Sequence, residues 1–202
     1  EINPDLLDLW SDPRLCPHFH LPLQSGCDDI LKSMRRRYDT RLYAAKVDLI
    51  RNILPDAGIT TDLIVGFPGE TEADFDETLS LCAEVEFDNA FLFKYSQRRD
   101  TPAAAMPDQL PESLIEERHA QLLEAVDVIR VRKLKKYIGR QMEILVEGPS
   151  RRNAARLEGR TRCNKIVVFE GGERFVGQVM NVKIIDATKT TLYGDPAILN
   201  LN

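Results

Sequence analysis

The stretch TTDLIVGFPGETEADF, residues 60–75, has the composition of a strand that runs through a glycine turn into a helix. Such a turn is a place where α/β proteins hold ligands. A phosphate-binding loop needs a lysine after its last glycine, but Glu70 follows Gly69 here, and a carboxylate would repel phosphate. The turn is therefore expected to offer backbone groups and an acid to a ligand with hydroxyls or positive charge, or to hold no ligand.

Polar side chains also follow the two other strands predicted in this part of the chain. Gln24 and Ser25 come at the end of an apolar strand in residues 15–26, and Lys94–Ser96 close the strand at residues 89–96. Ligands of parallel α/β sheets gather where the carboxyl ends of the strands meet. The sequence therefore predicts one ligand site built from these three strand ends, although such side chains can also serve only to satisfy loop backbone.

Metal ligands are sparse. His18 and His20 lie two residues apart, hence on one face of a strand, but the spacing suggests no third ligand. The four cysteines are scattered and have no C-x-x-C spacing, which argues against a zinc knuckle and against a disulfide scaffold. They are Cys16, Cys27, Cys82 and Cys163. We expect reduced thiols and a cytoplasmic location.

Basic residues gather in SRRNAARLEGRTRCNKIVVF, residues 150–169, where Glu158 is the one acid among them. The candidate phosphate contacts include Arg151, Arg152, Arg160, Arg162 and Lys165. Asn164 and Phe169 are candidate partners for nucleic-acid bases. The pattern favours a nucleic-acid surface; the alternative is a solvated charged edge that blocks strand-to-strand aggregation.

The elements that must position these residues alternate between strand and helix. Helical apolar spacing fills the chain between the predicted strands, and a long charged helix follows them. The expected order is a strand in 15–26, a helix through 28–54, strands at 59–65 and 89–96 around a helix near 75–85, and the long helix at 111–137. This order is typical of an α/β fold with a parallel sheet and helices outside it.

The sequence pattern changes after Gly139, where short runs alternate apolar and polar residues. Several short strands in about 60 residues without helical stripes predict a small antiparallel β-barrel. A hairpin is expected around Gly171 and Gly172. The predicted domains are residues 1–137 and 138–202.

Composition limits the class of protein. The 202 residues are 43% hydrophobic and 29% charged, as in ordinary globular proteins. No apolar run approaches the ~20 residues of a membrane span, so no membrane partner is expected. The net charge of −5 is uneven: residues from Ile138 on carry ten Lys or Arg and seven Asp or Glu, or +3, and the rest carries −8. A basic tail piece suits a polyanionic partner.

Taken together, the motifs resemble a known family. HLPLQSGCDDILKSMRRRY, TTDLIVGFPGETEADFDET and FLFKYSQRRDTPAAAMPDQ resemble the latter half of the radical-SAM methylthiotransferases. EGRTRCNKIVVFEG resembles their C-terminal TRAM domain, a small OB-like β-barrel that binds RNA. Within the family, FKYSQRRDTPAA and GRTRCNKIVVF are most similar to the MiaB type, which methylthiolates isopentenylated adenosine beside the anticodon of tRNA.

The resemblance implies a partial TIM barrel, the C-terminal half of a radical-SAM β/α barrel, whose strand ends hold S-adenosylmethionine. DLIVGFPGE resembles the segment that lines the adenine of the cofactor, and PLQSG resembles the segment near its ribose or methionine end. By this resemblance the cofactor-binding residues are Gln24, Ser25, Ile64, Val65, Gly66, Phe93 and Tyr95. The RNA contacts predicted from the basic run lie in the TRAM-like part of the chain and are Arg151, Arg152, Arg160, Arg162, Asn164 and Lys165.

The chain departs from the family at one decisive point. The family's C-x-x-x-C-x-x-C motif, which holds an iron–sulfur cluster through closely spaced cysteines, is absent. The chain is therefore expected to be a C-terminal portion that is inactive alone and retains neither cofactor. The full-length enzyme would carry S-adenosylmethionine and two 4Fe-4S clusters. Its expected partners are tRNA, a sulfur donor and the missing N-terminal domain of the same protein, in a monomer.

Two alternatives stay open from the sequence. RLCPHFHLPLQSG also resembles sister enzymes that act on threonylcarbamoyl-adenosine in tRNA, and a further sister modifies an aspartate of a ribosomal protein. A non-catalytic RNA-binding protein that kept part of the barrel as a scaffold belongs to a different class. An upstream C-x-x-x-C-x-x-C in the full gene would favour an enzyme over such a binder.

Overall fold

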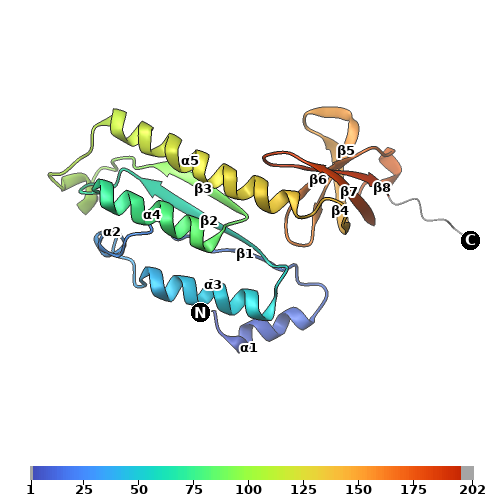
Figure 1. Ribbon diagram of the computed structural model, residues 1–202, viewed down its shortest axis with the longest axis horizontal. Helices are drawn as coiled ribbons and strands as arrows, with labels where there is room; N and C mark the ends of the chain where they lie inside the picture. Colours follow the sequence, from blue (N-terminus) through green and yellow to red (C-terminus); the bar gives the residue numbers. More distant parts are fainter. Residues whose placement is uncertain (1, 197–202) are drawn as a thin grey trace, which may run out of the picture. The chain divides into compact units, whose positions relative to one another are not determined.

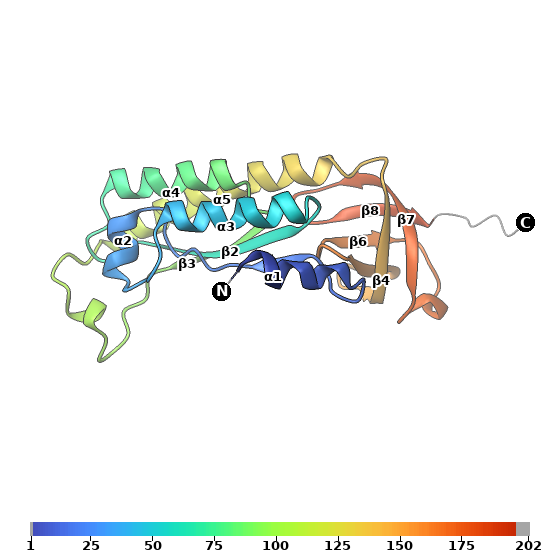
Figure 2. The same ribbon diagram turned by 90° about the horizontal axis from the view of Figure 1, so that it is seen from below.

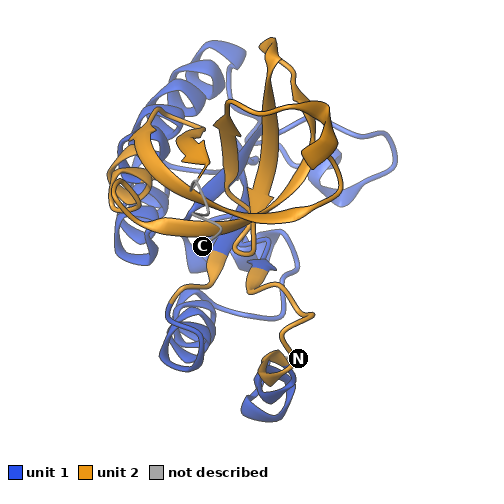
Figure 3. Ribbon diagram, turned by 90° about the vertical axis from the view of Figure 1, so that its right-hand side faces the viewer, with its two compact units in different colours: residues 1–9, 19–55, 59–129 blue, residues 10–18, 56–58, 130–202 orange. Residues whose placement is uncertain are grey.

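The computed structural model describes residues 2–196 and divides into two compact units (Figure 3). The first unit contains the residues up to Leu9, 19–55 and 59–129, and the second contains 10–18, 56–58 and the residues from Arg130 on. The boundary predicted at 137/138 falls inside the second unit, which also takes in the end of the long helix. Residues 197–202 of the predicted C-terminal domain lie outside the described residues.

The first unit is built on a three-stranded sheet in the order β1-β2-β3. The strands are β1 (His18–His20), β2 (Gly58–Val65) and β3 (Asn89–Lys94). β2 and β3 run parallel, with Asp62 opposite Phe91 and Ile64 opposite Phe93. β1 is shorter than the strand predicted over 15–26, yet Gln24 continues its line, because its amide donates to the carbonyl of Asp62 at 2.8 Å.

Helices cover one face of this sheet. The helices up to the barrel are, in chain order, α1 (Pro4–Leu7), η1 (Asp8–Ser11), α2 (Asp28–Ser33), α3 (Thr40–Ile53), α4 (Glu72–Val85), η2 (Pro102–Ala105) and α5 (Glu112–Lys135). Figure 2 shows α3, α4 and α5 together on one side of the strands. The buried side chains Leu63 and Val65 of β2 and Phe75 and Leu81 of α4 belong to the core that results. The predicted alternation of parallel strands and outer helices is confirmed.

The start of α4 follows directly from its sequence. Thr71 caps the helix by accepting a hydrogen bond from the amide of Asp74, and the Asp74 carboxylate accepts one from the amide of Thr71 at 2.8 Å. This reciprocal pair satisfies two backbone donors that the first turn of a helix leaves free, and such a cap stabilises by about 1 kcal/mol. Thr71 and Asp74, three residues apart, have the spacing of a capping box, so this helix start can be recognised in the sequence.

The second unit contains a closed β-barrel, labelled in Figure 1. Its strands are β4 (Gln141–Ser150), β5 (Asn153–Thr161), β6 (Ile166–Phe169), β7 (Val179–Ala187) and β8 (Leu192–Pro196), in the spatial order β4-β5-β6-β8-β7, with η3 (Glu173–Phe175) between β6 and β7. Alternate residues along each strand point inward, and Ile144, Leu157, Val167 and Ile184 form part of the core.

Two details of the predicted barrel are wrong. β6 and β7 do not form a hairpin around Gly171 and Gly172; β6 pairs instead with β5 and β8, and η3 occupies the connection. The barrel is also not purely antiparallel, because β6 and β8 run parallel, with Val168 opposite Tyr193. A glycine pair between two strand-like runs indicates a turn, but it does not specify which strands pair across it.

None of the helices in residues 2–196 is both long enough and apolar enough to cross a bilayer. The longest, α5, has 24 residues but carries charged side chains along its length.

Candidate functional site

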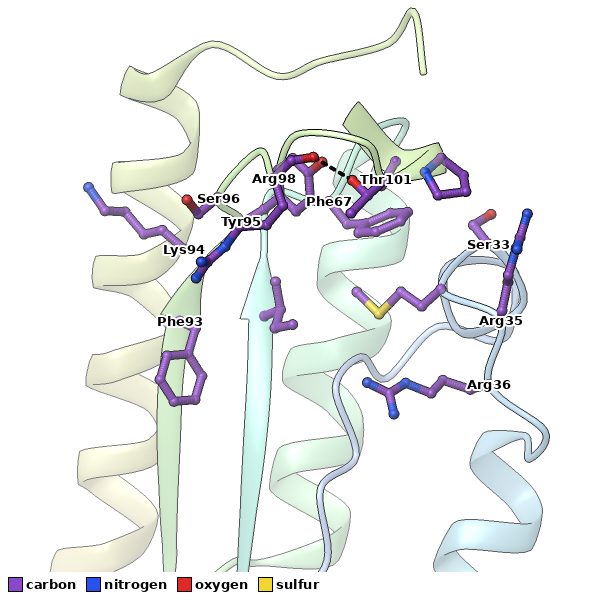
Figure 4. Close-up of a pocket in the computed structure, with 14 residues that line it drawn as sticks. Ser33, Arg35, Arg36, Phe67, Phe93, Lys94, Tyr95, Ser96, Arg98 and Thr101 are labelled. Carbon is purple, nitrogen blue, oxygen red and sulfur yellow. Dashed lines mark hydrogen bonds between the residues drawn. The ribbon is translucent and has the colours of Figure 1, made fainter. Parts of the chain in front are cut away.

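A cavity of about 480 Å³ lies in the first unit at the carboxyl ends of β2 and β3 (Figure 4). Its walls come from four separate segments of the chain, 33–36, 64–67, 93–98 and 101–103. Parallel α/β sheets bind ligands at this edge. The cavity is therefore where the sequence predicted a ligand site.

The apolar side of the cavity is aromatic. The rings of Phe67 and Tyr95 meet edge to face, with centroids 5.4 Å apart, and pack with Cys27 and Ile30 in one apolar cluster. The hydroxyl oxygen of Tyr95 is buried and has no hydrogen-bond partner among the described residues. Buried polar atoms nearly always have a partner, so this hydroxyl marks a point where a ligand or a water would bind.

Cationic residues from two segments also line the cavity. Arg35, Arg36, Lys94 and Arg98 are exposed residues that line it. Hydrogen bonds from the Lys94 ammonium to Glu112 at 2.7 Å and Glu116 at 3.3 Å raise the pKa of that exposed lysine. Aromatic walls beside guanidinium groups suit a ligand that has a flat apolar ring and an anionic group.

The predicted cofactor residues divide into two sets. Ile64, Phe93 and Tyr95 line the cavity. Gln24, Ser25, Val65 and Gly66 are buried and are not among its lining residues. Gln24 and Ser25 instead shape the backbone: Gln24 has a left-handed φ of 74°, and the Ser25 hydroxyl accepts a hydrogen bond from the amide of Cys27 at 3.2 Å.

The glycine turn does not present its acid to a ligand, which corrects the expectation from the sequence. Glu70 is buried, and its carboxylate accepts hydrogen bonds from the amide of Gly66 at 3.0 Å and from the guanidinium of Arg118 at 2.8 Å. Burial raises the pKa of Glu70, and these two hydrogen bonds oppose the shift. Arg118 also donates to the carbonyl of Glu70 and lies over the ring of Phe75. The acid thus ties the turn to α5.

Gly66 is required at its position for two reasons. Its φ of +77° lies in the left-handed region, and a Cβ there would come within 2.5 Å of the Ile115 side chain. The glycine therefore serves the close packing of the turn against α5.

The thiols of the first unit are poor candidates for cluster ligands. Burial first, and then a hydrogen bond from its sulfur to Asp74 at 3.0 Å, raise the pKa of Cys27 to about 12. Burial raises the pKa of Cys82 to about 12 as well. A metal ligand must be a thiolate, and burial makes deprotonation of these two thiols more costly than that of an exposed thiol. Cys27, Asp74 and Glu77 place their ligand atoms within 4.8 Å of one another, but Asp74 is already held by the cap of α4.

A second candidate site is a groove of about 390 Å³ on the outside of the barrel. We call it the arginine groove, because Arg151, Arg152, Arg156 and Arg160 line it. Its apolar residues are Ile166, Val168 and Tyr193. Tyr193 is half-buried, and cations around an accessible aromatic ring are the combination with which proteins hold single-stranded nucleic acid.

Acidic residues partly offset the cations of the arginine groove. Arg160 lies 3.1 Å from Glu147, Arg156 lies 3.4 Å from Glu170, and Glu158 is itself a lining residue. Exposed ion pairs of this kind contribute little and are screened by salt, so phosphate can compete for the arginines.

The remaining predicted RNA residues lie elsewhere. Arg162 donates hydrogen bonds to the carbonyls of Pro13 and Leu15, and Asn164 accepts one from Arg160 at 2.9 Å. Lys165 is buried, with its ammonium 5.0 Å above the ring of Tyr137, so we remove it from the phosphate-binding set.

Phe169 is 1% exposed in the barrel core, so the suggestion that it contacts bases is wrong. Tyr193, which the sequence analysis missed, is the aromatic residue at the surface. No signal in its own neighbourhood marks it; only the pairing of β8 with β6 brings it beside the arginines.

Two family models match the chain. Residues 1–82 match the radical SAM superfamily, and residues 135–197 match the TRAM domain. The first part of the chain is therefore similar to the radical SAM superfamily, and its last part is similar to the TRAM domain.

The curated relatives are more specific. The chain is 47% identical over 199 residues to the tRNA-2-methylthio-N(6)-dimethylallyladenosine synthase of Methylacidiphilum infernorum. The aligned region covers 98% of this chain and 43% of that enzyme. It is 48% identical over 184 residues to the synthase of the same name from Akkermansia muciniphila, and the aligned region covers 91% of this chain and 40% of that enzyme. The resemblance to methylthiotransferases of the MiaB type is confirmed, and the chain spans about two fifths of the length of these relatives.

A solved structure supports the fold. Coproporphyrinogen III oxidase (HemN) from Escherichia coli, described as a radical SAM enzyme, matches with a TM-score of 0.50 and 15% identity over 80% of this chain and 44% of that chain. At this identity the match shows the fold alone.

Proposed function

We propose that the chain is the part of a radical-SAM tRNA methylthiotransferase that supplies one wall of the cofactor site and the RNA-holding barrel. The observation that carries this proposal is the 47–48% identity, over nine tenths or more of this chain, to enzymes named for methylthiolation of dimethylallyladenosine in tRNA. In the full-length protein the three parallel β/α units would form the latter half of a partial TIM barrel. The proposed location is the cytoplasm, in a monomer.

The cavity fits part of S-adenosylmethionine. Ile64, Phe93, Phe67 and Tyr95 offer the apolar and aromatic contacts that an adenine ring takes, and the free Tyr95 hydroxyl offers a hydrogen bond. When bound beside a reduced cluster, this cofactor supplies a radical that abstracts a hydrogen atom. The residues of this chain would hold its adenosine end and exclude water from it.

The thiols of this chain do not fit an iron–sulfur cluster. Cys27 precedes α2 and Cys82 lies in α4, both are buried, and the four cysteines of the chain have no cluster spacing. The clusters, the sulfur donor and the N-terminal domain would therefore be contributed from outside residues 1–202.

The arginine groove is the proposed contact for tRNA. Its four arginines would meet phosphates, while Tyr193 would stack on an unpaired base. The acidic remainder of the chain, with a charge of −8 before Ile138, would favour docking of the polyanion at the barrel.

The test is mass spectrometry of tRNA nucleosides from a strain that lacks the gene. We expect loss of the methylthiolated dimethylallyladenosine and accumulation of its unthiolated precursor, with recovery on complementation by the full-length gene. Loss of the methylthiolated threonylcarbamoyl nucleoside instead would assign the sister activity. Normal tRNA in both respects would contradict the proposed function and favour a binding protein.

A further inference from the structure

The turn between β5 and β6 brings a thiol and an amine of the second unit together. Lys165 Nζ lies 3.5 Å from Cys163 Sγ, and the two residues are only 7% and 6% exposed. The Thr161 hydroxyl lies 3.3 Å from the same sulfur, and the Tyr137 hydroxyl lies 4.0 Å from it. A sulfur beside a cation and two hydroxyls differs from the apolar surroundings that keep structural cysteines inert.

The backbone of this turn is closed by hydrogen bonds around the pair. The amide of Lys165 donates to the Thr161 hydroxyl at 2.9 Å, and the amide of Thr161 donates to the carbonyl of Lys165 at 2.9 Å. Asn164, between the two reactive residues, has a left-handed φ of 63°, which asparagine adopts more readily than most residues. The backbone between sulfur and nitrogen is therefore fixed, and only the flexible lysine side chain has to move for the two atoms to bond.

A small reagent can reach the sulfur. Cys163 lines a cavity of about 340 Å³ within the second unit. Glu143 and Arg162 line the same cavity with side chains that are 47% and 40% exposed, so the cavity opens to solvent. A water molecule takes up about 30 Å³ in the liquid, and hydrogen peroxide is only slightly larger. Peroxide therefore has room to enter and meet the thiol.

We propose that Cys163 and Lys165 form a reversible covalent cross-link when the protein meets hydrogen peroxide. In the first step the sulfur attacks one oxygen of peroxide and the O–O bond breaks, which gives a sulfenic acid and water. In the second step the Lys165 nitrogen, after giving up a proton, attacks that sulfur. An S–N bond forms, the S–O bond breaks and a second water leaves. The sulfur loses two electrons, peroxide gains them, and no other reactant is needed.

The position of the amine favours this cross-link over other fates of the sulfenic acid. A sulfenic acid condenses with a thiol or a nitrogen, or is oxidised further. Lys165 Nζ is already within 3.5 Å of the reacting sulfur, and a nucleophile held at such a distance reacts far faster than one that must diffuse to it. Cys16, the exposed thiol of the chain, is the alternative partner, and its product is a disulfide.

The test maps tryptic peptides of the purified chain after treatment with hydrogen peroxide, without reductant. In the reduced chain trypsin cleaves after Arg162 and after Lys165 and releases the peptide 163–165. We expect the treated chain to lose cleavage after Lys165, because the modified amine is no longer a trypsin site. It should yield the peptide 163–174 instead, lighter by two hydrogen atoms than its reduced form. Dithiothreitol should restore the original map.

Variants separate the amine from the thiol. Lys165→Met removes the amine and keeps the length of the side chain, so the sulfenic acid of Cys163 should accumulate and take up dimedone severalfold more than in the wild type. Cys163→Ser should give neither product. Lys183→Met is the matched control, because it removes an exposed lysine of β7 and should leave the cross-link unchanged. Cys16→Ser should also leave it unchanged.

Three results would overturn the inference. One is normal release of the peptide 163–165 after treatment, whether Cys163 is unchanged or carries oxygen. The second is equal dimedone labelling of the wild type and Lys165→Met. The third is a loss of two hydrogen atoms that maps to a disulfide with Cys16 and disappears in Cys16→Ser. The peptide map of the wild type needs no variant, so it decides the matter even if a substitution in the turn impairs folding.

Discussion

The cavity of the first unit takes its lining from four short segments between Ser33 and Ala103, whereas the arginine groove takes most of its lining from β4, β5 and the turn between them. In the first unit, parallel pairing brings distant strand ends to one edge, so residues far apart in sequence become neighbours. In the barrel, residues adjacent in sequence are separated, because alternate positions on a strand face opposite sides. Arg156 and Arg160 share the outer side of β5, whereas Lys165, in the turn between β5 and β6, is buried.

The two sites differ in how well a sequence motif predicts which residues come together. Strand ends in a parallel sheet converge whatever the residues between them are, so the location of the cavity follows from the order of elements. A run of basic residues on a β-barrel does not by itself form a surface site, because each residue must also face the outside of the barrel.

The largest expected effect comes from breaking the buried ion pair behind the cavity. Arg118→Met would leave the Glu70 carboxylate buried with its strongest partner removed, and we expect a loss of about 3–5 kcal/mol in the free energy of unfolding. Urea unfolding followed by far-ultraviolet circular dichroism would measure it, because most helices belong to the first unit.

Glu72→Gln is the matched control for this variant. Glu72 is the other carboxylate near Arg118, at 3.2 Å, but its side chain is 69% exposed, so we expect a change within about 0.5 kcal/mol. A loss below about 1 kcal/mol for Arg118→Met would mean that the pair does not hold the turn.

This ion pair could not be predicted from local sequence patterns. The glycine turn and the capping box of α4 were predictable, because both depend on residues within a few positions of each other. The role of Glu70 was not, since its partner Arg118 lies 48 residues further along the chain on another helix. Of the seven predicted cofactor residues, Ile64, Phe93 and Tyr95 line the cavity, whereas the other four are buried in the fold and do not line it.

The pairing of the barrel strands could not be predicted from local sequence patterns either. The alternation of apolar and polar residues after Gly139 predicted strands there, and Ile144 and Val146 of β4 belong to the barrel core. The order β6-β8-β7 could not be read from the turn at Gly171, because the parallel pairing of β6 with β8 joins segments that are separated by the whole of β7. Tyr193 was missed for that reason.

The next effect tests the arginine groove. We expect Arg156→Ala with Arg160→Ala to weaken binding of a tRNA anticodon stem-loop and to reduce the slope of log affinity against log salt by about one to two units. Each replaced arginine removes at most one phosphate contact and the counterion released there. Filter binding at several salt concentrations measures both quantities.

A variant with the same loss of charge outside the groove distinguishes phosphate contacts in the groove from the general effect of the protein's charge. Arg174→Ala with Lys183→Ala removes two cations that do not line the groove, and we expect a slope close to that of the wild type. Equal slopes for all three proteins would show that the groove does not hold phosphate.

Replacing the aromatic residue of the groove should have a smaller effect of a different kind. Tyr193→Ala would remove a stacking surface worth about 1–3 kcal/mol per base without removing a charge. The affinity should fall, while the salt slope stays that of the wild type. A change in slope would instead indicate that the ring supports the arginines, and the same salt series would detect it.

The smallest expected effect concerns the hydroxyl of Tyr95 in the cavity. Since this buried group has no partner among the described residues, Tyr95→Phe should leave the ligand-free chain as stable as before or more stable by up to about 1 kcal/mol. Tyr43→Phe is the matched control, because the Tyr43 hydroxyl donates to the carbonyl of Leu21 at 2.7 Å, and its removal should cost about 1 kcal/mol. Thermal unfolding by calorimetry measures both. If Tyr95→Phe destabilises as much as Tyr43→Phe, the Tyr95 hydroxyl already has a partner in solution and is not held ready for a ligand.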